Sequence, residues 1–209
     1  EVANRAAPRV LLADEVGLGK TIEACLILHR LHLCGRASRV LILLPDALVN
    51  QWFVELYRRF SLSFAIYDEE RALSIETGGK TAEEGGPVNP FFDDQFILCA
   101  TSWIASHPYR AAQAAAGAWD LLIVDEAHHL EWSLESSSPA YDAVEAIAKG
   151  SAGLLLLTAT PEQLGREGHF ARLRLLDPAR FSDLDEFVRE SEKYRSISEL
   201  ADRLRGEEK

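Results

Sequence analysis

Short, uninterrupted runs of hydrophobic residues alternate along the chain with longer amphipathic segments. Several of these runs show no alternation of apolar and polar positions, which is typical of strands buried on both faces of a parallel sheet. The predicted strands are Arg9–Ala13, Arg39–Leu44, Ser63–Tyr67, Phe96–Ala100, Asp120–Val124 and Gly153–Leu157. The predicted helices are Lys20–Leu33, Asp46–Phe60, Ser102–Ala116, Ala140–Lys149, Glu162–Leu176 and Leu184–Leu204. The alternation predicts an α/β fold with a mainly parallel sheet flanked by helices.

The composition is that of an ordinary globular domain. Hydrophobic residues make up 47% of the chain and charged residues 26%, which argues against a disordered chain. No hydrophobic run approaches the roughly 18 residues that would span a bilayer. The cysteines have no metal-binding spacing and predict reduced packing residues of a cytoplasmic protein: Cys25, Cys34 and Cys99. The chain contains no methionine, so we expect it to be a piece of a longer protein.

The net charge of −11 is unevenly distributed. Residues 68–94 hold eight acidic and two basic side chains together with glycine and proline, a composition that predicts a solvated loop. The acidic balance argues against a large phosphate-binding face, although backbone N–H groups of a loop can still bind phosphate. Residues 181–209 carry charges of both signs with weak apolar periodicity. We expect residues 1–180 to form the main lobe and residues 181–209 a helical extension or connector.

A phosphate-binding loop is predicted between the first strand and the first helix. Here Gly17 and Gly19 allow the backbone N–H groups to turn inward, and the helix start adds the positive end of a dipole. Lys20 can reach the β- and γ-phosphates of a nucleotide, and the hydroxyl of Thr21 can bind Mg²⁺. The usual pattern has glycine where this chain has Asp14. The predicted loop residues are Asp14, Glu15, Val16, Gly17, Leu18, Gly19, Lys20 and Thr21.

A second Gly-Lys-Thr sequence, Gly79–Thr81, lacks the context that a phosphate loop requires. No apolar strand precedes it, and nearby carboxylates would repel phosphate. We therefore predict an exposed loop there that does not bind nucleotide.

The strand Asp120–Val124 runs directly into two carboxylates, as the site of a Mg-nucleotide requires opposite its phosphate loop. Asp125 can hold Mg²⁺ through water, and Glu126 can orient and deprotonate the attacking water. Ala127 and His128 follow directly and are predicted to belong to the same nucleotide-binding segment. Zinc is not predicted at His128 and His129, because no histidine or carboxylate lies at helical metal spacing from them.

The last predicted strand leads into Thr158, Ala159, Thr160 and Pro161. Hydroxyl groups at a strand end can bond to the acidic segment and respond to the γ-phosphate. A strand that simply closes in a Thr/Pro turn explains the segment equally well when it is taken alone. The two preceding motifs favour the functional interpretation of Thr158 and Thr160.

In this order and spacing, the three motifs resemble the first RecA-like lobe of superfamily-two helicases and translocases. The segment from Leu11 to Ala24 is similar to the phosphate loop of the Swi/Snf ATPases, which begins with aspartate and so accounts for Asp14. Leu44–Pro45 and the Asn50-Gln51-Trp52 sequence resemble that family's next motif. The segments Trp119–Leu130 and Thr158–Pro178 are most similar to its bacterial members that associate with RNA polymerase.

The resemblance implies an ATP- and Mg²⁺-dependent hydrolase that moves along DNA or RNA and acts in transcription with RNA polymerase. It also implies a RecA-like sheet with the Gly153–Thr158 strand between the phosphate-loop strand and the Asp125 strand. Thr101, Ser102 and residues near Pro45 fall where the family contacts the nucleic-acid backbone, and a helix cap by Thr101 or Ser102 is the alternative. Trp52 is expected to pack in the core.

Two other functions remain open from the residues alone. A phosphate-loop kinase would need a second substrate pocket and a lid with arginines. A non-catalytic interaction module would be expected to lose Lys20 or Glu126, and both are present. The family implies that a second RecA-like lobe supplies an arginine to the transferred phosphoryl group. We therefore expect this chain alone to hydrolyse little ATP.

Overall fold

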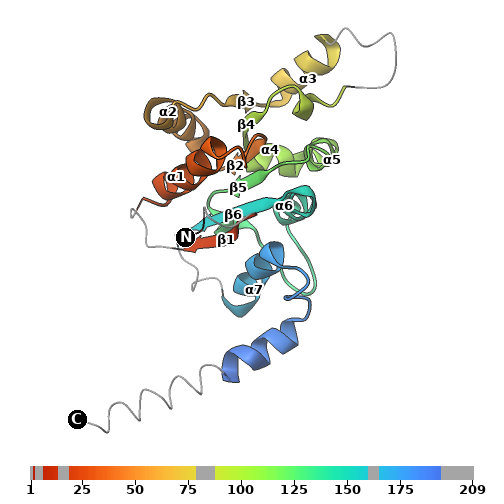
Figure 1. Ribbon diagram of the computed structural model, residues 1–209. Coiled ribbons are helices and arrows are strands. Elements are labelled where there is room, and N and C mark those ends of the chain that lie inside the picture. The colour runs from red at the N-terminus through yellow and green to blue at the C-terminus, as the bar shows by residue number, and fades with distance from the viewer. Residues whose placement is uncertain (1, 3–6, 14–18, 79–87, 160–164, 194–209) are drawn as a thin grey trace, which may run out of the picture.

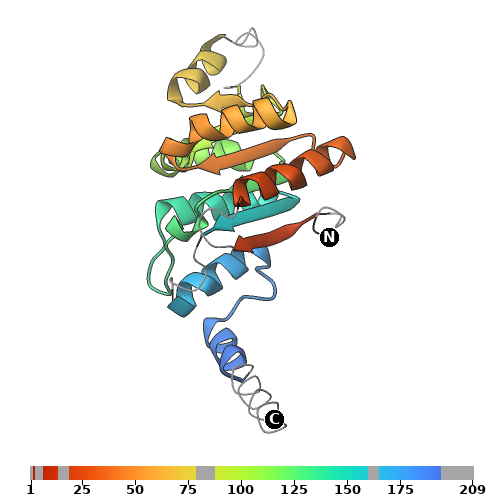
Figure 2. The same cartoon turned by 90° about the vertical axis from the view of Figure 1, so that its left-hand side faces the viewer.

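The six strands form one parallel sheet in the computed structural model, which describes residues 2, 7–13, 19–78, 88–159 and 165–193. Across the sheet the order is β1-β6-β5-β2-β4-β3, and Figure 2 shows the strands running in one direction. The predicted place of the last strand between the first strand and the Asp125 strand is thus confirmed. The strands are β1 (Arg9–Ala13), β2 (Val40–Leu44), β3 (Ala65–Tyr67), β4 (Phe96–Ala100), β5 (Leu121–Val124) and β6 (Gly153–Thr158).

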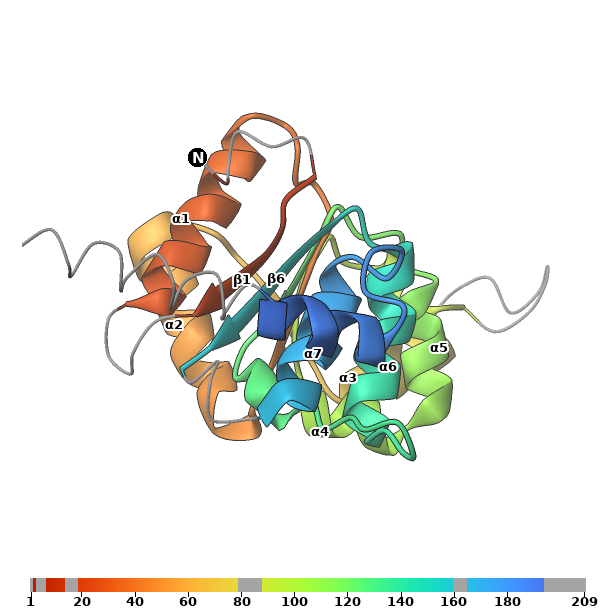
Figure 3. The same cartoon turned by 90° about the horizontal axis from the view of Figure 1, so that it is seen from below.

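Helices cover both faces of the sheet (Figure 1). One face carries α1 (Lys20–Leu33) and α2 (Val49–Phe60), and the other carries α4 (Thr101–Ser106), α5 (Pro108–Ala115) and α6 (Pro139–Gly150). Seen from below in Figure 3, α7 (Gly165–Leu176) lies on the α6 side, where it packs against β1. No helix in the described part of the chain is long and apolar enough to cross a membrane.

The central strand β2 explains why the strand sequences lack alternation. Leu41 and Leu43 point into the core beneath α4 to α7, whereas Val40, Ile42 and Leu44 point into the core beneath α1 and α2. All five side chains are fully buried, because helices cover both faces. Uniformly apolar strands are what a doubly covered parallel sheet needs.

Three helix predictions differ from the structure. The predicted helix over residues 102–116 is two helices, because Pro108 lacks an N–H group and disfavours helical geometry at His107. Residues 46–48 form a short 3₁₀ helix, η2 (Asp46–Leu48), so that α2 begins at Val49. Residues 184–193 are helical, and the rest of the predicted final helix lies outside the described residues.

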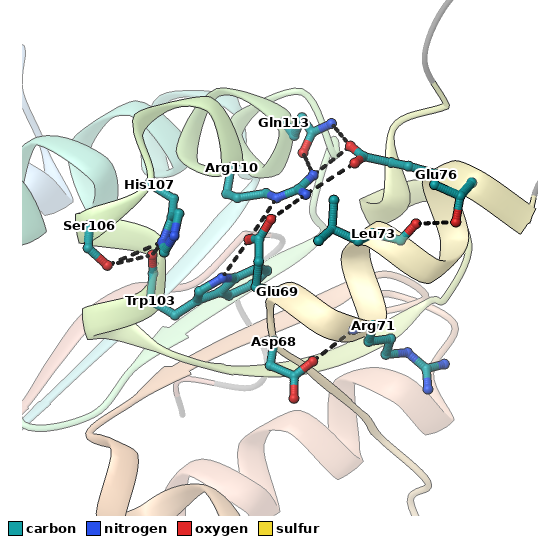
Figure 4. Close-up of polar contacts among 11 residues, drawn as sticks. Asp68, Glu69, Arg71, Leu73, Glu76, Trp103, Ser106, His107, Arg110 and Gln113 are labelled. Carbon is teal, nitrogen blue, oxygen red and sulfur yellow. Dashed lines mark hydrogen bonds and ion pairs between the residues drawn. The ribbon is translucent and has the colours of Figure 1, made fainter.

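The prediction of a solvated loop over residues 68–94 is wrong for much of the segment. Residues Glu69–Gly78 form α3, and Pro90–Phe92 form the 3₁₀ helix η3. Glu69 and Glu76 of α3 share a buried partner, because Arg110 of α5 is only 3% exposed and points at them (Figure 4). Gly79–Thr81, the second Gly-Lys-Thr sequence, lies outside the described residues.

Arg110 joins α3 to α5 through charged hydrogen bonds. Its guanidinium donates to both carboxylate oxygens of Glu69 at 2.7 and 3.1 Å, and to Glu76 at 2.5 and 3.1 Å. Gln113 donates to Glu76 at 2.8 Å, and the indole of Trp103 donates to Glu69 at 3.1 Å. Two carboxylates around one guanidinium fix the helix that the local sequence does not predict.

Removal of this guanidinium should destabilise the fold. Arg110→Met leaves two carboxylates without their partner, and we expect a loss of about 2–3 kcal/mol, below the fully buried case because the Glu69 side chain is 39% exposed. The melting temperature should fall by roughly 4–12 °C. The control is Arg71→Met, which breaks the more exposed pair with Asp94 and should cost at most about 1 kcal/mol. Equal losses in the two variants, measured by calorimetry, would contradict the assignment.

The same cluster predicts loss of stability in acid. Hydrogen bonds from Arg110 lower the pKa of Glu69 to about 2 and also lower the pKa of Glu76. Because these values are depressed on folding, the stabilisation is complete above the unfolded value near 4.5 and is lost as the pH falls toward about 2. Arg110→Met should remove this part of the acid dependence in pH-resolved thermal unfolding.

Candidate active site

The predicted motifs converge at the carboxyl edge of the sheet. In the strand register Ala13 is opposite Thr158, and Leu156 is opposite Val124, so that β1, β6 and β5 end side by side. Asp125 directly follows Val124. This edge of an open parallel sheet is where α/β proteins bind their ligands.

Helix α1 begins after a glycine in a left-handed conformation. Gly19 caps the helix with φ 85°, a left-handed conformation that glycine adopts without strain. Among the described residues no atom lies within 4 Å of where a Cβ would stand, and the backbone angle itself favours glycine. Lys20 and Thr21 begin the helix and are half-buried. The predicted loop residues Asp14, Glu15, Val16, Gly17 and Leu18 lie outside the described residues.

Asp125 is held from three sides. Its backbone N–H donates to Leu43 at 3.0 Å, which continues the β2–β5 pairing by one residue. One carboxylate oxygen accepts the Nε1–H of Trp52 at 2.9 Å, and the other accepts the backbone N–H of Glu126 at 2.8 Å. Trp52 is 1% exposed on α2, which confirms its packing role and adds a polar one.

The electrostatics of Asp125 connect it to the phosphate-loop side. Burial raises the pKa of this carboxyl above its usual range, and the hydrogen bonds from Glu126 and Trp52 oppose that rise. The charge of Lys20 also favours the ionised form of Asp125 and so lowers its pKa. The predicted cation and the predicted metal ligand are therefore close enough to interact.

Glu126 has a strained backbone. Its φ of 49° and ψ of 44° place a non-glycine residue in the left-handed region, which costs about 1–3 kcal/mol. The 3₁₀ helix η4 (Ala127–His129) starts immediately after it. Oε2 of Glu126 lies 3.0 Å from Nδ1 of His128, at an angle that falls short of a hydrogen bond. Such strain is characteristic of sites where a side chain must be aimed.

The two histidines after Glu126 form a tilted pair with ring centroids 4.0 Å apart. Burial lowers the pKa of His128, and the positive charges of His129 and Arg172 lower it further. The charges of Glu126 and Asp125 oppose this shift, and the net lowering favours the neutral imidazole. No cluster of three potential metal-binding side chains occurs among the described residues.

Arg172 of α7 is a residue of this site that was not predicted from the sequence. This side chain is 1% exposed and donates from Nε to the carbonyl of Ala127 and from Nη2 to the carbonyl of His128, each at 3.0 Å. Nη1 donates to the carbonyl of Gly168. An arginine between apolar residues of a helix is the only sequence signal, and it does not indicate which carbonyls the side chain will reach.

The third motif and the predicted nucleic-acid residues also reach this edge. Thr158 is fully buried at the end of β6, between β1 and β5, and Thr160 lies outside the described residues. A cavity of about 250 Å³ is lined by Thr101 and Ser102 together with Asp125 and Glu126. Neither hydroxyl caps α4, which corrects the capping alternative; Ser102 donates instead to Asp46 at 2.6 Å.

Comparison with known proteins agrees with this geometry. A family model described as the SNF2-related domain matches residues 3–206. RNA polymerase-associated protein RapA of Vibrio campbellii is 54% identical over all 209 residues, and RapA of Pectobacterium atrosepticum is 52% identical. In both cases the match covers 21% of the relative, so the chain spans about a fifth of the length of these curated relatives.

Solved structures show the same fold. The Sulfolobus solfataricus SWI2/SNF2 ATPase core in complex with dsDNA has a TM-score of 0.65 at 21% identity, covering 85% of this chain and 33% of that one. The Pyrococcus furiosus Hef helicase domain has a TM-score of 0.61 at 19% identity, over 84% of this chain and 34% of that one. The predicted RecA-like α/β fold is thereby confirmed. Together with the family match, the sheet order and the placement of Asp125 and Glu126 show that this chain belongs to the SNF2-related domain family.

Proposed function

We propose that this chain is the ATP-binding lobe of an ATP-dependent translocase that moves along nucleic acid and works with RNA polymerase. The observation that carries the proposal is the convergence of α1's start with Asp125 and Glu126 at one edge of the sheet. Lys20 and Asp125 interact across that edge, and Glu126 is held in a strained conformation beside them. Residues 1–180 would form the lobe, with residues 181–209 as a helical connector.

The charge distribution suits a nucleoside triphosphate. Lys20 at the positive end of α1 would neutralise the β- and γ-phosphates, and the left-handed Gly19 would turn its N–H toward them. The loop residues 14–18 would add further N–H groups. When bound, Mg²⁺ would neutralise the remaining phosphate charge. Thr21 and Asp125 fit as its holders, because each oxygen of Asp125 that accepts a hydrogen bond keeps a second lone pair.

Glu126 would act on the water that attacks the γ-phosphorus. The carboxylate accepts a proton from this water as the new O–P bond forms and the bond to the leaving diphosphate breaks. Its neighbour His128 has a lowered pKa, which favours the neutral imidazole and so disfavours a counter-charge beside Glu126. Thr158, buried between β1 and β5, would report on the γ-phosphate together with Thr160.

The nucleic-acid contact is proposed at the cavity beside this site. Thr101 and Ser102 line the same cavity as Asp125 and Glu126, so a nucleic-acid backbone that contacts their hydroxyl groups would lie next to the catalytic edge. The fold is shared with a SWI2/SNF2 ATPase core solved with dsDNA. Backbone contacts of this kind position a protein on nucleic acid without reading its sequence.

The partner is proposed from the relatives. Both RapA relatives are named as RNA polymerase-associated proteins, and a partner of bacterial RNA polymerase works in the cytoplasm. The kinase alternative gains no support from the cavity beside Asp125 and Glu126, because none of the described residues that line it is an arginine. The non-catalytic alternative does not explain why Lys20 and Glu126 are both retained.

The proposal is tested by nucleic-acid-stimulated ATP hydrolysis. A polypeptide that carries this chain and the second RecA-like lobe should release phosphate faster when duplex DNA or RNA is added. Direct binding to purified RNA polymerase, measured by interferometry, tests the partner. Absence of ATP hydrolysis with every nucleic acid would refute the translocase, whereas absence of polymerase binding would refute only the partner.

Lys20→Ala should weaken Mg-ATP binding by roughly 1.5–3 kcal/mol, the usual worth of a hydrogen bond to a charged group. The melting temperature should stay nearly unchanged, because Lys20 is half-buried at a helix start and not in the core. Titration calorimetry with ATP and Mg²⁺ measures the loss. The control is Lys149→Ala, an exposed lysine on α6 that pairs with Glu145 and should leave affinity unchanged. Unchanged affinity in Lys20→Ala would refute the assignment of this loop.

A further inference from the structure

Arg172 is a buried cation whose partners, among the described residues, are all backbone carbonyls. The guanidinium donates to Ala127, His128 and Gly168, and no carboxylate pairs with it in this part of the chain. Burial lowers the pKa of Arg172, yet arginine stays protonated in proteins. Burial of an unpaired charge is costly, and an apolar residue of similar volume would serve packing alone at least as well. The stability of the core therefore does not account for an arginine here.

The two carbonyls outside α7 that Arg172 binds belong to the turn that follows Glu126. Ala127 and His128 are the next two residues, and their carbonyls fix the direction of the chain as it leaves the strained position. The turn's own hydrogen bonds run from His129 to Glu126 and from Leu130 to Ala127, at 3.0 and 3.2 Å. These local bonds alone would not prevent relaxation to the ordinary right-handed conformation, because they bridge only three residues.

Helix α7, which carries Arg172, is itself held in place by hydrogen bonds from two other elements. Tyr141 donates to the carbonyl of Ala171 at 3.2 Å, next to Arg172, and Arg9 of β1 donates to the carbonyls of Leu175 and Leu176 at 2.8 Å. Arg9 belongs to a strand of the sheet, and Tyr141 belongs to α6, which covers one face of it. The fork of Arg172 thus joins β1, α6 and α7 to the Glu126 turn.

We propose that Arg172 is a positioning residue that holds the strained Glu126 turn in the geometry needed to aim the Glu126 carboxylate at the attacking water. This inference rests on the proposed function, since it assigns Arg172 to the same hydrolytic site. Arg172 does not touch substrate; it acts through the backbone of Ala127 and His128.

The test compares two buried arginines. Arg172→Met keeps volume and removes the donors, and Arg110→Met is the matched control, remote from the site and equally buried. In the ATP-hydrolysing, two-lobed protein, Arg172→Met should lower kcat about 10- to 100-fold with KM for ATP within about twofold, because a small misplacement of a catalytic group costs up to about 10²-fold. Arg110→Met should leave kcat within about twofold below its melting temperature.

A double-mutant cycle separates positioning from general damage. If Arg172 acts through Glu126, then adding Arg172→Met to Glu126→Gln should cause almost no further loss of kcat. Fully additive losses, a change confined to KM, or an equal loss in Arg110→Met would overturn the proposal. Should the methionine variant fail to fold, Arg172→Lys keeps the charge but not the planar fork and should still lower kcat about tenfold.

Hydrogen exchange on the 209-residue chain gives a readout that needs no turnover. Amides in residues 126–130 should exchange about tenfold faster in Arg172→Met than in the unaltered chain, and at the unaltered rate in Arg110→Met. Equal exchange in all three proteins would overturn the proposal even if the activities differ. If the two-lobed protein does not hydrolyse ATP at all, the proposed function fails, while this measurement still decides whether Arg172 holds the turn.

Discussion

Glu126→Gln should reduce ATP turnover by about 10²–10⁴-fold in a two-lobed protein that carries this chain, while Mg-ATP affinity stays within about twofold. Glutamine has the same shape but cannot accept the proton of the attacking water. The left-handed backbone at this position is set by the turn and not by the charge, so it should persist in the variant. Asp125 keeps its backbone bond from residue 126 and its indole bond from Trp52. The loss of activity should therefore appear as a lower kcat, with the affinity for Mg-ATP unchanged.

The matched control is Glu131→Gln, an exposed carboxylate five residues further along the chain. It tests whether removal of one negative charge near the site is enough to change turnover. Phosphate release and titration calorimetry are run on both variants. A large loss of affinity in Glu126→Gln, or similar turnover in Glu126→Gln and the unaltered protein, would show that Glu126 does not act on the water.

Predictions about the sheet were accurate because one local signal determines each strand. A run such as Val40–Leu44 can only be buried on both faces, and it therefore lies in the middle of the sheet. The strand Phe96–Ala100 and the helix Lys20–Leu33 have the predicted limits. Flanking residues mark the limits of such elements. The left-handed Gly19, for example, marks the start of the helix.

The failures occurred where distant side chains override local composition. Glu69 and Glu76 look like residues of a solvated loop, but Arg110, 34 to 41 residues away, gives them a buried partner and a helix forms.

A different failure concerns a local signal. Pro108 disfavours a continuous helix, and the prediction of one helix over residues 102–116 did not take it into account. The residues that follow Pro108 are rich in alanine, which favours a helix, so one continuous helix was predicted.

At the site too, residues of contiguous motifs were predicted, whereas the contacts from distant parts of the chain were not. Asp125, Glu126 and Lys20 were predicted from motifs because each motif is contiguous in sequence. Trp52 and Arg172, which hold the acidic segment, come from 73 and 44 to 45 residues away. No spacing rule links an indole on α2 to a carboxylate at the end of β5. The contact follows from the order of strands and the packing of α2 on the sheet, which the sequence specifies only through the whole fold.

A polypeptide of these 209 residues alone should hydrolyse ATP at close to the uncatalysed rate, even with duplex DNA present. The family implies that a second RecA-like lobe supplies an arginine to the transferred phosphoryl group, and such an arginine is worth about 10³–10⁵ in rate. Arg172, the arginine that contacts the Glu126 turn, cannot replace it, because its donors are engaged with carbonyls and its side chain is buried.

The measurement compares steady-state phosphate release from the 209-residue chain and from a two-lobed polypeptide, at matched ATP, Mg²⁺ and DNA. The two-lobed polypeptide should be faster by at least about 10³-fold, the lower end of what a phosphoryl-contacting arginine contributes. Adding the second lobe as a separate polypeptide is the control, since partial recovery would show that the missing group acts in trans. If the 209-residue chain alone reached the DNA-stimulated rate of the two-lobed protein, the charge on the transferred phosphoryl group would have to be stabilised from within this lobe. Lys20 would then be the first group to test, because it begins helix α1 on the side of the proposed phosphate site.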